Sequence, residues 1–474
     1  MSRPAAPSLG PLDRYRPIVD DWPAFVEAMS RPAPACVWAH EGRIRPGALE
    51  AMLRADGVEP ASLPWHGGAF RIGRPEGLGN HWWYRAGLCH AQEEASVLPV
   101  RLLDPRPGER VLDLCAAPGG KTAQISLAVG LRGTVVANEF RMARLRALRS
   151  TLDRLGLANV SLTHHDGLQF PVEAGPFDRV LVDAPCSDEG VVRRKPHLVE
   201  TLGEKLSLQM SARQIGLLRR GLSLCRPGGR VVYSTCTFAP EENEAVVDAA
   251  LGSATHPARV VEAGMPGFRT GPGLDSWNGR RFHPSLRHAL RVWPHHRDTG
   301  GFFVAVLERE GEADPRSPAW RCPEPAPAEE WRPYAAERYE MPPSVWEPFL
   351  VFRRASRGLH VISRHHRAPV APPLHATGLF LVRDRVRFPK LSSVGALLVG
   401  GHACRNRVEL ERSQVEAYYE RRTLPLISGQ DEGCDGLGYV VVTHRGHPLG
   451  TGLIAPEVGT LRSLYPRRWA GESS

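Results

Sequence analysis

The sequence predicts an α/β fold with a doubly wound, mainly parallel sheet between about residues 108 and 310. Short apolar runs that end in small or polar residues alternate there with longer stretches of helical spacing. The first run leads into a loop rich in alanine and glycine, and two later runs lead into Cys186 and Cys236. Because ligands of such sheets bind at the carboxyl ends of the strands, we expect the loop and both cysteines at one site.

Strands are expected at 110–114, 134–137, 160–163, 179–182, 230–233 and 302–307. Helices are expected between them, at 121–129, 141–156 and 206–224. The second helix carries one apolar stripe, formed by Met142, Leu145, Leu148, Leu152 and Leu155. Regular alternation of strand and helix is typical of a parallel sheet covered on both faces, as in Rossmann-like domains.

The rest of the chain is expected to form smaller domains, because 474 residues exceed what one compact core holds. We expect a small N-terminal α+β domain and, beyond a proline-rich linker, β-rich C-terminal modules. The predicted boundaries, in chain order, are 1–100 (N-terminal domain), 101–310 (Rossmann-like domain), 311–335 (linker), 336–405 (first β-rich module) and 406–474 (second β-rich module).

The composition narrows the class of protein and of partner. A net charge of +9 favours a polyanionic partner over an acidic protein surface. The nine cysteines form no C-x-x-C pair, so we expect neither a disulfide framework nor a bound metal. The chain has no apolar run typical of a signal peptide and none long enough to span a bilayer. We expect a cytoplasmic protein with reduced thiols and no membrane partner, and we assume a monomer, since the sequence does not reveal the oligomeric state.

The loop after the first strand is expected to bind a cofactor. It reads Cys115-Ala116-Ala117-Pro118-Gly119-Gly120-Lys121 and lacks the G-x-x-x-x-G-K-[ST] spacing of a triphosphate loop. Glu139, after the second strand, can accept hydrogen bonds from ribose hydroxyls, and Asp166, after the third, from an adenine amino group. Ribose and adenine contacts without a pyrophosphate cradle favour S-adenosylmethionine over NAD. A glycine-rich turn or a lone acid is common without any ligand, so the prediction depends on the whole ordered set, which also includes Asp183.

The two cysteines at strand ends indicate covalent chemistry on a pyrimidine. Carbon 5 of cytosine attacks a methyl sulfonium readily only after a thiolate has added to carbon 6. Such a mechanism needs a nucleophilic cysteine, an acid near N3 and a group that helps to release the product. Asp183 and Cys186 share one loop and Cys236 ends a neighbouring strand, so all three are candidates for one pocket. A single cysteine is more often a small buried hydrophobe, and for Cys115 we expect only backbone contact with the cofactor.

Five stretches of the chain resemble, in the same order, the Nop/Sun family of RNA cytosine-5 methyltransferases. They are QEEAS (92–96), LDLCAAPGGKT (112–122), VDAPCS (182–187), RPGGRVVYSTCT with PEENEAVV (226–247) and RVWPHHRDTGGFFVA (291–305). The related DNA enzymes take their nucleophile from the Pro-Cys loop, so the cysteine in Thr-Cys-Thr indicates RNA as the substrate. The resemblance covers roughly half of the chain.

This resemblance implies roles for the candidate residues. Cys236 would be the nucleophile, Cys186 would help to release the methylated product, and Asp183 would contact both the cofactor and the target cytosine. S-adenosylmethionine would be held by Cys115, Ala116, Ala117, Pro118, Gly119, Gly120, Lys121, Glu139, Asp166 and Asp183. One position departs from the family, which usually has glycine where this chain has Asp188; an acid there could raise the pKa of the neighbouring thiol.

The tail indicates the kind of RNA. Residues 438–469 are similar to the PUA-like RNA-binding end of the RsmF type, whose bacterial members modify small-subunit ribosomal RNA. Basic residues at 193–195 and at Arg353, Arg354, Arg357, Arg364 and Arg367 are expected phosphate contacts. The N-terminal domain is also expected to contact RNA, although it has Cys36-Val37-Trp38-Ala39 where the family has an Arg-Val-Asn core.

The sequence therefore predicts an S-adenosylmethionine-dependent RNA cytosine-5 methyltransferase that acts on an unstacked cytosine of ribosomal RNA. Two alternatives remain open. The substrate could be transfer RNA, or the chain could be an RNA-binding ribosome assembly factor in which methylation is vestigial. The intact set of Cys236, Cys186, Asp183 and the cofactor loop argues against the second alternative.

Overall fold

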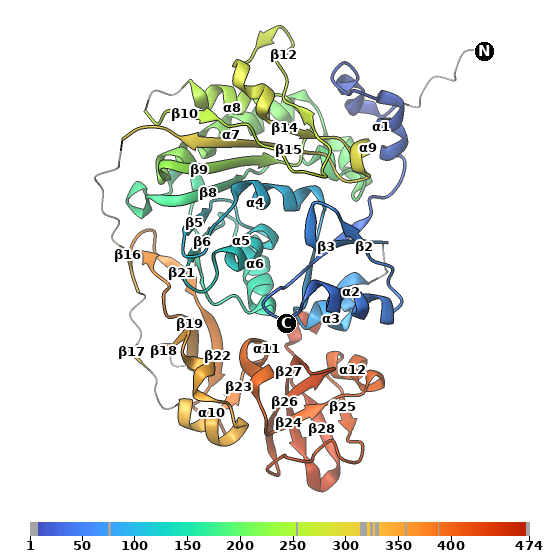
Figure 1. The fold of residues 1–474 in the computed structure, drawn as a ribbon, viewed down its shortest axis with the longest axis vertical. Coiled ribbons are helices and arrows are strands. Elements are labelled where there is room, and N and C mark those ends of the chain that lie inside the picture. Colours follow the sequence, from blue (N-terminus) through green and yellow to red (C-terminus); the bar gives the residue numbers. More distant parts are fainter. Residues whose placement is uncertain are drawn as a thin grey trace, which may run out of the picture.

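The computed structural model describes residues 8–73, 77–252, 255–312, 320–322, 326–327, 331–355, 358–386 and 388–470. Arg357 and much of the predicted linker lie outside these residues. Figure 1 shows the central sheet in the upper half of the molecule, strands β2 and β3 beside it and the C-terminal strands below. Within the described part of the chain, no helix has both the length and the apolar character needed to cross a membrane.

The predicted Rossmann-like sheet is present. Five neighbouring strands run parallel in the order β7-β6-β5-β8-β9. Their bounds are β5 Arg110–Asp113, β6 Thr134–Asn138, β7 Val160–Thr163, β8 Phe177–Asp183 and β9 Cys225–Thr235. The sheet continues beyond β9 through antiparallel strands: β15 (Phe302–Arg309), β14 (Leu290–Val292) and β11 (Gly271–Pro272), with β10 (Ala258–Val260) also paired to β15. The α/β class predicted from the alternating pattern is confirmed.

Helices cover both faces of this sheet. One face packs on α4 (Leu98–Leu103), α5 (Gly120–Val129) and α6 (Met142–Leu155), and the other on α7 (Glu204–Leu224) and α8 (Glu244–Leu251). Successive strand residues alternate between the two cores: Val111 lies in the first and Leu112 in the second. Each strand is therefore apolar on both sides, which explains the continuous apolar runs in the sequence.

The N-terminal part forms a separate antiparallel sheet of order β2-β3-β1-β4. Its strands are β1 Ala35–Ala39, β2 Ala61–Leu63, β3 His66–Ile72 and β4 Cys89–Gln92, with helices α2 (Pro46–Ala55) and α3 (Trp82–Arg85). The segment before it, which includes α1 (Trp22–Met29), packs elsewhere. Phe25 of α1 lies in a core with Phe238 and Trp293, which come from the part of the chain that forms the central sheet.

Two five-stranded sheets follow in the C-terminal part. The first has the order β17-β18-β19-β22-β23, with bounds Ala326–Pro327, Phe349–Ala355, Gly358–Ser363, Leu379–Arg383 and Lys390–Leu391. The second has the order β24-β26-β27-β28-β25, with bounds Arg407–Glu409, Gly438–His444, His447–Ala455, Thr460–Ser463 and Thr423–Pro425. The helices here are α10 (Trp331–Tyr339), α11 (Ser393–Val399), α12 (Arg412–Tyr419) and α13 (Arg467–Ala470).

Both C-terminal sheets join the rest of the molecule through buried contacts. Strand β21 (Leu374–Thr377) adds to the free edge of the central sheet by pairing antiparallel with β7. The last sheet shares one core with α3, where the Tyr419 hydroxyl donates to the backbone oxygen of Trp82 at 3.2 Å. The domain boundaries drawn from the sequence stay predictions, but these contacts show that the parts pack as neighbours.

Candidate active site at the ends of the parallel strands

A cavity of about 680 Å³ opens at the carboxyl ends of β5, β6, β8 and β9. The structure brings most of the predicted site residues to its wall: Cys115, Ala117, Pro118, Lys121, Glu139, Asp183, Cys186 and Cys236. Ala116, Gly119, Gly120 and Asp166 are not among the lining residues. The cavity therefore joins the predicted cofactor loop to both predicted catalytic thiols.

The glycines of the cofactor loop are needed for packing. Gly119 has a φ of +107°, and a Cβ added there would lie 2.9 Å from a methyl group of Leu148 on α6. A Cβ on Gly120 would lie 2.9 Å from the side-chain oxygen of Gln92 on β4. Both positions thus allow α5 to start close to its neighbours, and their predicted contact with a cofactor stays a prediction.

The predicted cofactor acids already have partners. Asp183 accepts a hydrogen bond from Ser234 Oγ at 2.7 Å and pairs with Lys121 Nζ at 2.8 Å. Glu139 is almost fully buried and accepts from the backbone NH of Arg141 at 2.8 Å. Asp166 accepts from the backbone NH of Leu168 and, at 2.9 Å, from the Arg213 guanidinium. These bonds fix the positions of the three carboxylates, of which Glu139 and Asp183 line the cavity.

Asp113 is a further acid that the sequence reasoning did not select. It ends β5, is 1% exposed and accepts a hydrogen bond from Thr122 Oγ1 at 2.7 Å. Burial raises its pKa to about 7. Its second oxygen has no hydrogen-bond partner among the described residues. The position of Asp113 at the end of a predicted buried strand is the sequence feature that could have identified it.

The two thiols lie side by side at the other end of the cavity. Cys186 Sγ and Cys236 Sγ are 3.3 Å apart, and the Cys236 thiol donates to Asp188 Oδ1 at 3.0 Å. The bond with Cys186, together with burial, raises the pKa of Cys236 well above its ordinary value. For Cys186, the bond with Cys236 lowers the pKa, but burial and the charge of Asp188 outweigh it, so the pKa is raised. Both cysteines are therefore thiols at neutral pH.

Two buried glutamates that the sequence reasoning did not assign hold the cysteine loops together. Glu189 accepts from the hydroxyls of Tyr15 and Thr237, both at 2.8 Å, and from the backbone NH of Phe238. Glu242 accepts from the backbone NH of Ser187 at 3.0 Å and from Gln214 Nε2 at 2.8 Å. Because these bonds link the segment after Cys186 to the segment after Cys236, they fix the spacing of the two sulfur atoms.

Comparison with known proteins agrees with this geometry. A family model described as 16S rRNA methyltransferase RsmB/F matches residues 100–308, and one described as the RsmF PUA domain matches residues 405–470. Ribosomal RNA small subunit methyltransferase F of Klebsiella pneumoniae is 30% identical over 475 residues, which cover 94% of this chain and 91% of that protein. The chain belongs to the RsmB/F family.

Other relatives of this RsmB/F chain match only part of it. A human 28S rRNA (cytosine(4447)-C(5))-methyltransferase is 39% identical over 238 residues, which are 49% of this chain and only 29% of the human protein. A methyltransferase homologue from Pyrococcus horikoshii has a solved structure with 30% identity and a TM-score of 0.55, covering 64% of this chain and 99% of that one. NSun6 from the same organism, solved with SFG, shares the fold at 20% identity and a TM-score of 0.54, over 61% of this chain and 94% of that one.

Basic side chains surround the cavity of this RsmB/F protein. Arg144, Arg194, Lys195 and Arg213 line it. Arg193, which we expected to contact phosphate, is instead 5% exposed and pairs with Asp298 at 2.5 Å. The cationic rim is therefore built from residues of several segments, and one member of the predicted cluster has a structural role.

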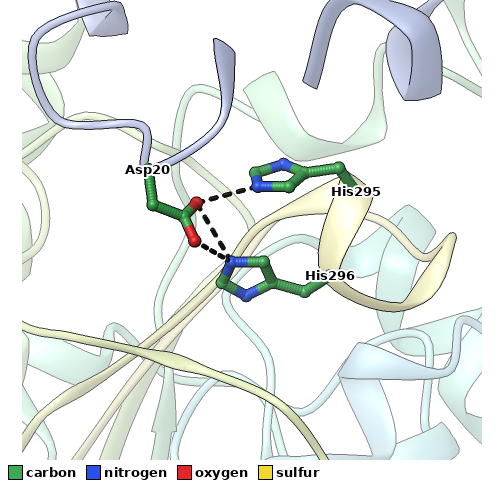
Figure 2. Close-up of side chains that lie close together, drawn as sticks. All are labelled: Asp20, His295 and His296. Carbon is green, nitrogen blue, oxygen red and sulfur yellow. Dashed lines mark hydrogen bonds and ion pairs between the residues drawn. The ribbon is translucent and has the colours of Figure 1, made fainter. Parts of the chain in front are cut away.

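Figure 2 shows a second cluster of polar side chains, which does not line the cavity. The Asp20 carboxylate accepts from His295 Nε2 at 2.8 Å and from His296 Nε2 at 3.0 Å, and it pairs with Arg269 at 3.0 Å. These residue types can bind a metal ion, but a cation here would lie beside the Arg269 guanidinium and displace bonds that already use both oxygens. We interpret the cluster as a structural contact that holds the segment around Asp20 against α9 (Pro294–Arg297).

Proposed function

We propose that this chain is an S-adenosylmethionine-dependent RNA (cytosine-5) methyltransferase and that its substrate is ribosomal RNA of the small subunit. One observation carries the proposal: two cysteine sulfur atoms 3.3 Å apart lie on the wall of the same cavity as the predicted cofactor loop. A methyl donor and a nucleophilic thiol must share one pocket if a base is to be attacked at carbon 6 and methylated at carbon 5.

The cavity fits the proposed cofactor. Its volume lies within the usual range of small-molecule sites, roughly 300–1,000 Å³. Leu114, Pro118 and Phe140 supply apolar surface for an adenine ring, and Glu139 supplies a carboxylate for ribose hydroxyls. Bound there, S-adenosylmethionine supplies an electrophilic methyl group on a sulfonium. The protein's own part is to orient that group towards the base and to exclude water.

The proposed reaction divides the work among three side chains. Cys236 Sγ bonds to carbon 6 of an unstacked cytosine, and carbon 5 then takes the methyl group. Asp183, whose position is fixed by Lys121 and Ser234, faces the cavity and would hold the N3 edge of the ring. Cys186 would assist when the proton leaves carbon 5 and the bond between carbon 6 and Cys236 breaks.

Two observations support ribosomal RNA as the substrate. The relative that matches 94% of this chain is named as a methyltransferase of small-subunit ribosomal RNA, and the PUA-domain match extends over residues 405–470. The net charge of +9 and the cationic rim of the cavity suit a polyanion. Transfer RNA remains the second candidate because the rim alone does not select one RNA.

Bisulfite sequencing of total RNA tests this proposal. Cells with the gene, cells without it and cells complemented with Cys236→Ala are compared. We expect one protected cytosine in small-subunit ribosomal RNA that is lost on deletion and not restored by the variant. A lost site in transfer RNA would overturn the substrate but keep the chemistry. If deletion changed no site, the chain would be better explained as an RNA-binding assembly factor.

A further inference from the structure

A carboxylate lies beside the two thiols, in the loop that follows Cys186. Asp188 Oδ1 is 3.0 Å from Cys236 Sγ, to which it is hydrogen bonded, and 3.7 Å from Cys186 Sγ. Among the described residues, no lysine, arginine or histidine pairs with Asp188, and none makes a hydrogen bond to either thiol. Among the described residues, the charged group in direct contact with the thiols is therefore a carboxylate and not a cation.

We propose that Asp188 is a catalytic residue, the base that takes the Sγ proton of Cys236 when sulfur bonds to carbon 6, and the acid that returns it when that bond breaks. The inference rests on the proposed function.

The chemistry of the thiol explains why a base is needed. A cysteine nucleophile reacts as the thiolate, and reactive cysteines usually have a lowered pKa because a cation or a histidine lies nearby. Here the neighbouring Cys186, burial and Asp188 all raise the pKa of Cys236, so almost no thiolate is present at neutral pH. Attack therefore requires that the proton leaves as the bond between sulfur and carbon forms, and Asp188 Oδ1 already accepts that proton's hydrogen bond.

The backbone conformation at Asp188 suits glycine at least as well as aspartate. Asp188 has a φ of +62°, in the left-handed region that glycine adopts without strain and that aspartate adopts more readily than most other residues. Two bonds hold it there: the NH of Val191 donates to its carbonyl at 2.9 Å, and the NH of Gly190 donates to the carbonyl of Cys236 at 2.8 Å. Glycine would fit this backbone better, so what aspartate adds is the carboxylate beside sulfur.

The step balances without a further reagent. The electron pair of the Cys236 S–H bond forms the bond between sulfur and carbon 6, and the proton passes to Asp188 Oδ1. The π bond between carbons 5 and 6 breaks, and its electron pair forms the bond between carbon 5 and the methyl group, while the electrons of the donor's sulfur–methyl bond stay on the donor. After methyl transfer, loss of the carbon 5 proton to a second base restores the double bond between carbons 5 and 6, and the electrons of the bond between sulfur and carbon 6 return to sulfur. The thiolate then takes back the proton from Asp188. The Asp188 side chain is exposed, so it can also exchange that proton with water.

The first test isolates the covalent step. RNA transcribed with 5-fluorocytidine lets sulfur add and carbon 5 take the methyl group, but fluorine cannot leave as a proton does, so the adduct accumulates. We expect Asp188→Asn, which keeps the size of the side chain but cannot take the proton, to form this adduct about 10²-fold more slowly than the parent protein. Asp104→Asn is the matched control: Asp104 also has a positive φ, 52°, but does not line the cavity.

The second test separates a base from a charge that merely suppresses the thiol. Iodoacetamide alkylation is followed by mass spectrometry of the peptide that carries Cys236. Removal of the Asp188 charge lowers the pKa of the thiol, so Asp188→Asn and Asp188→Gly should be alkylated faster than the parent protein while they form adduct more slowly. These opposite changes are specific to a catalytic base.

The outcomes distinguish this inference from the proposed function. If the parent protein forms adduct but Asp188→Asn forms it equally fast, or both adduct formation and alkylation become faster, Asp188 is not the base. If the parent protein forms no adduct with ribosomal or transfer RNA and transfers no methyl group to them, the proposed function fails instead. Unchanged cofactor affinity of the variants, measured by calorimetry, shows that the cavity is intact.

Discussion

The two ends of the cavity use their carboxylates differently. We call the end near the predicted cofactor loop the cofactor end and the end with Cys186 and Cys236 the thiol end. At the cofactor end, Asp183 is paired with Lys121, nearby Asp166 is paired with Arg213, and Glu139 accepts a hydrogen bond from a backbone NH. At the thiol end, Asp188 has thiols as its hydrogen-bond donors and takes part in no ion pair among the described residues. The cofactor end is thus electrostatically complete and suited to binding, whereas the thiol end holds protons that can move and is suited to chemistry.

The largest effect is expected at the thiol end. Cys236→Ala removes the proposed nucleophile and should lower methyl transfer by at least about 10³-fold, because the thiol whose addition activates carbon 5 is lost and Cys186 is assigned to release. The cofactor end should be unaffected, so S-adenosylmethionine should bind within about twofold of the parent affinity. Single-turnover transfer of labelled methyl groups and calorimetry measure the two effects. Substantial residual transfer would contradict the assignment of Cys236.

Cys186→Ala should give the next largest effect, and of a different kind. If Cys186 assists release, the variant should attack the base normally and then stall, with turnover reduced about a hundredfold. A protein–RNA adduct that survives denaturant should accumulate and be visible by gel electrophoresis. The control is the double variant with Cys236→Ala, which should give no adduct. If Cys186→Ala turned over slowly without any adduct, a role in release would be excluded.

A smaller effect is expected at the cofactor end. Glu139→Gln removes the charge that is proposed to hold the ribose, and S-adenosylmethionine should bind about tenfold more weakly, the usual range for one charge-assisted hydrogen bond. Alkylation of Cys236 should not change, because Glu139 is not among the groups that shift its pKa. Cofactor affinity and the alkylation rate of Cys236 are measured in parallel on this variant. If both changed, the two ends of the cavity would not act independently.

The sequence predicted the central sheet and the convergence of the site well, because both follow from local patterns. Each apolar run ends where a strand ends, so residues such as Asp183 and Cys236 had to meet at one edge of a parallel sheet. The scaffold acids Glu189 and Glu242 could not be assigned, since their partners, such as Tyr15 and Gln214, lie far away in the chain. Long-range pairing leaves no periodic signal in the sequence.

The same limit applies to the surface. His366, which lies between the expected phosphate contacts Arg364 and Arg367, is fully buried and hydrogen bonded to Ser161 Oγ at 2.8 Å. The second β-rich module contributes Tyr419 to a core that it shares with Trp82 of the N-terminal part. Removing it would expose that core, so its contribution to RNA binding is better measured with charge substitutions than by truncation.

The smallest effect concerns the scaffold that joins the two cysteine loops. Burial raises the pKa of Glu242 to about 7, above its ordinary value of 4.5. A raised pKa means that the folded state prefers the protonated acid, so this residue's contribution to the free energy of unfolding is complete below about pH 4.5 and is lost as the pH rises to about 7. The loss amounts to about 3 kcal/mol at most.

Glu242→Gln should flatten the dependence of the free energy of unfolding on pH in that window, as measured by urea unfolding at several pH values. Glu308→Gln, at a side chain that is 38% exposed, should leave the slope unchanged. An unaltered slope in Glu242→Gln would mean that this buried carboxyl ionises freely, and the loops of Cys186 and Cys236 would then be joined by a charged group at neutral pH.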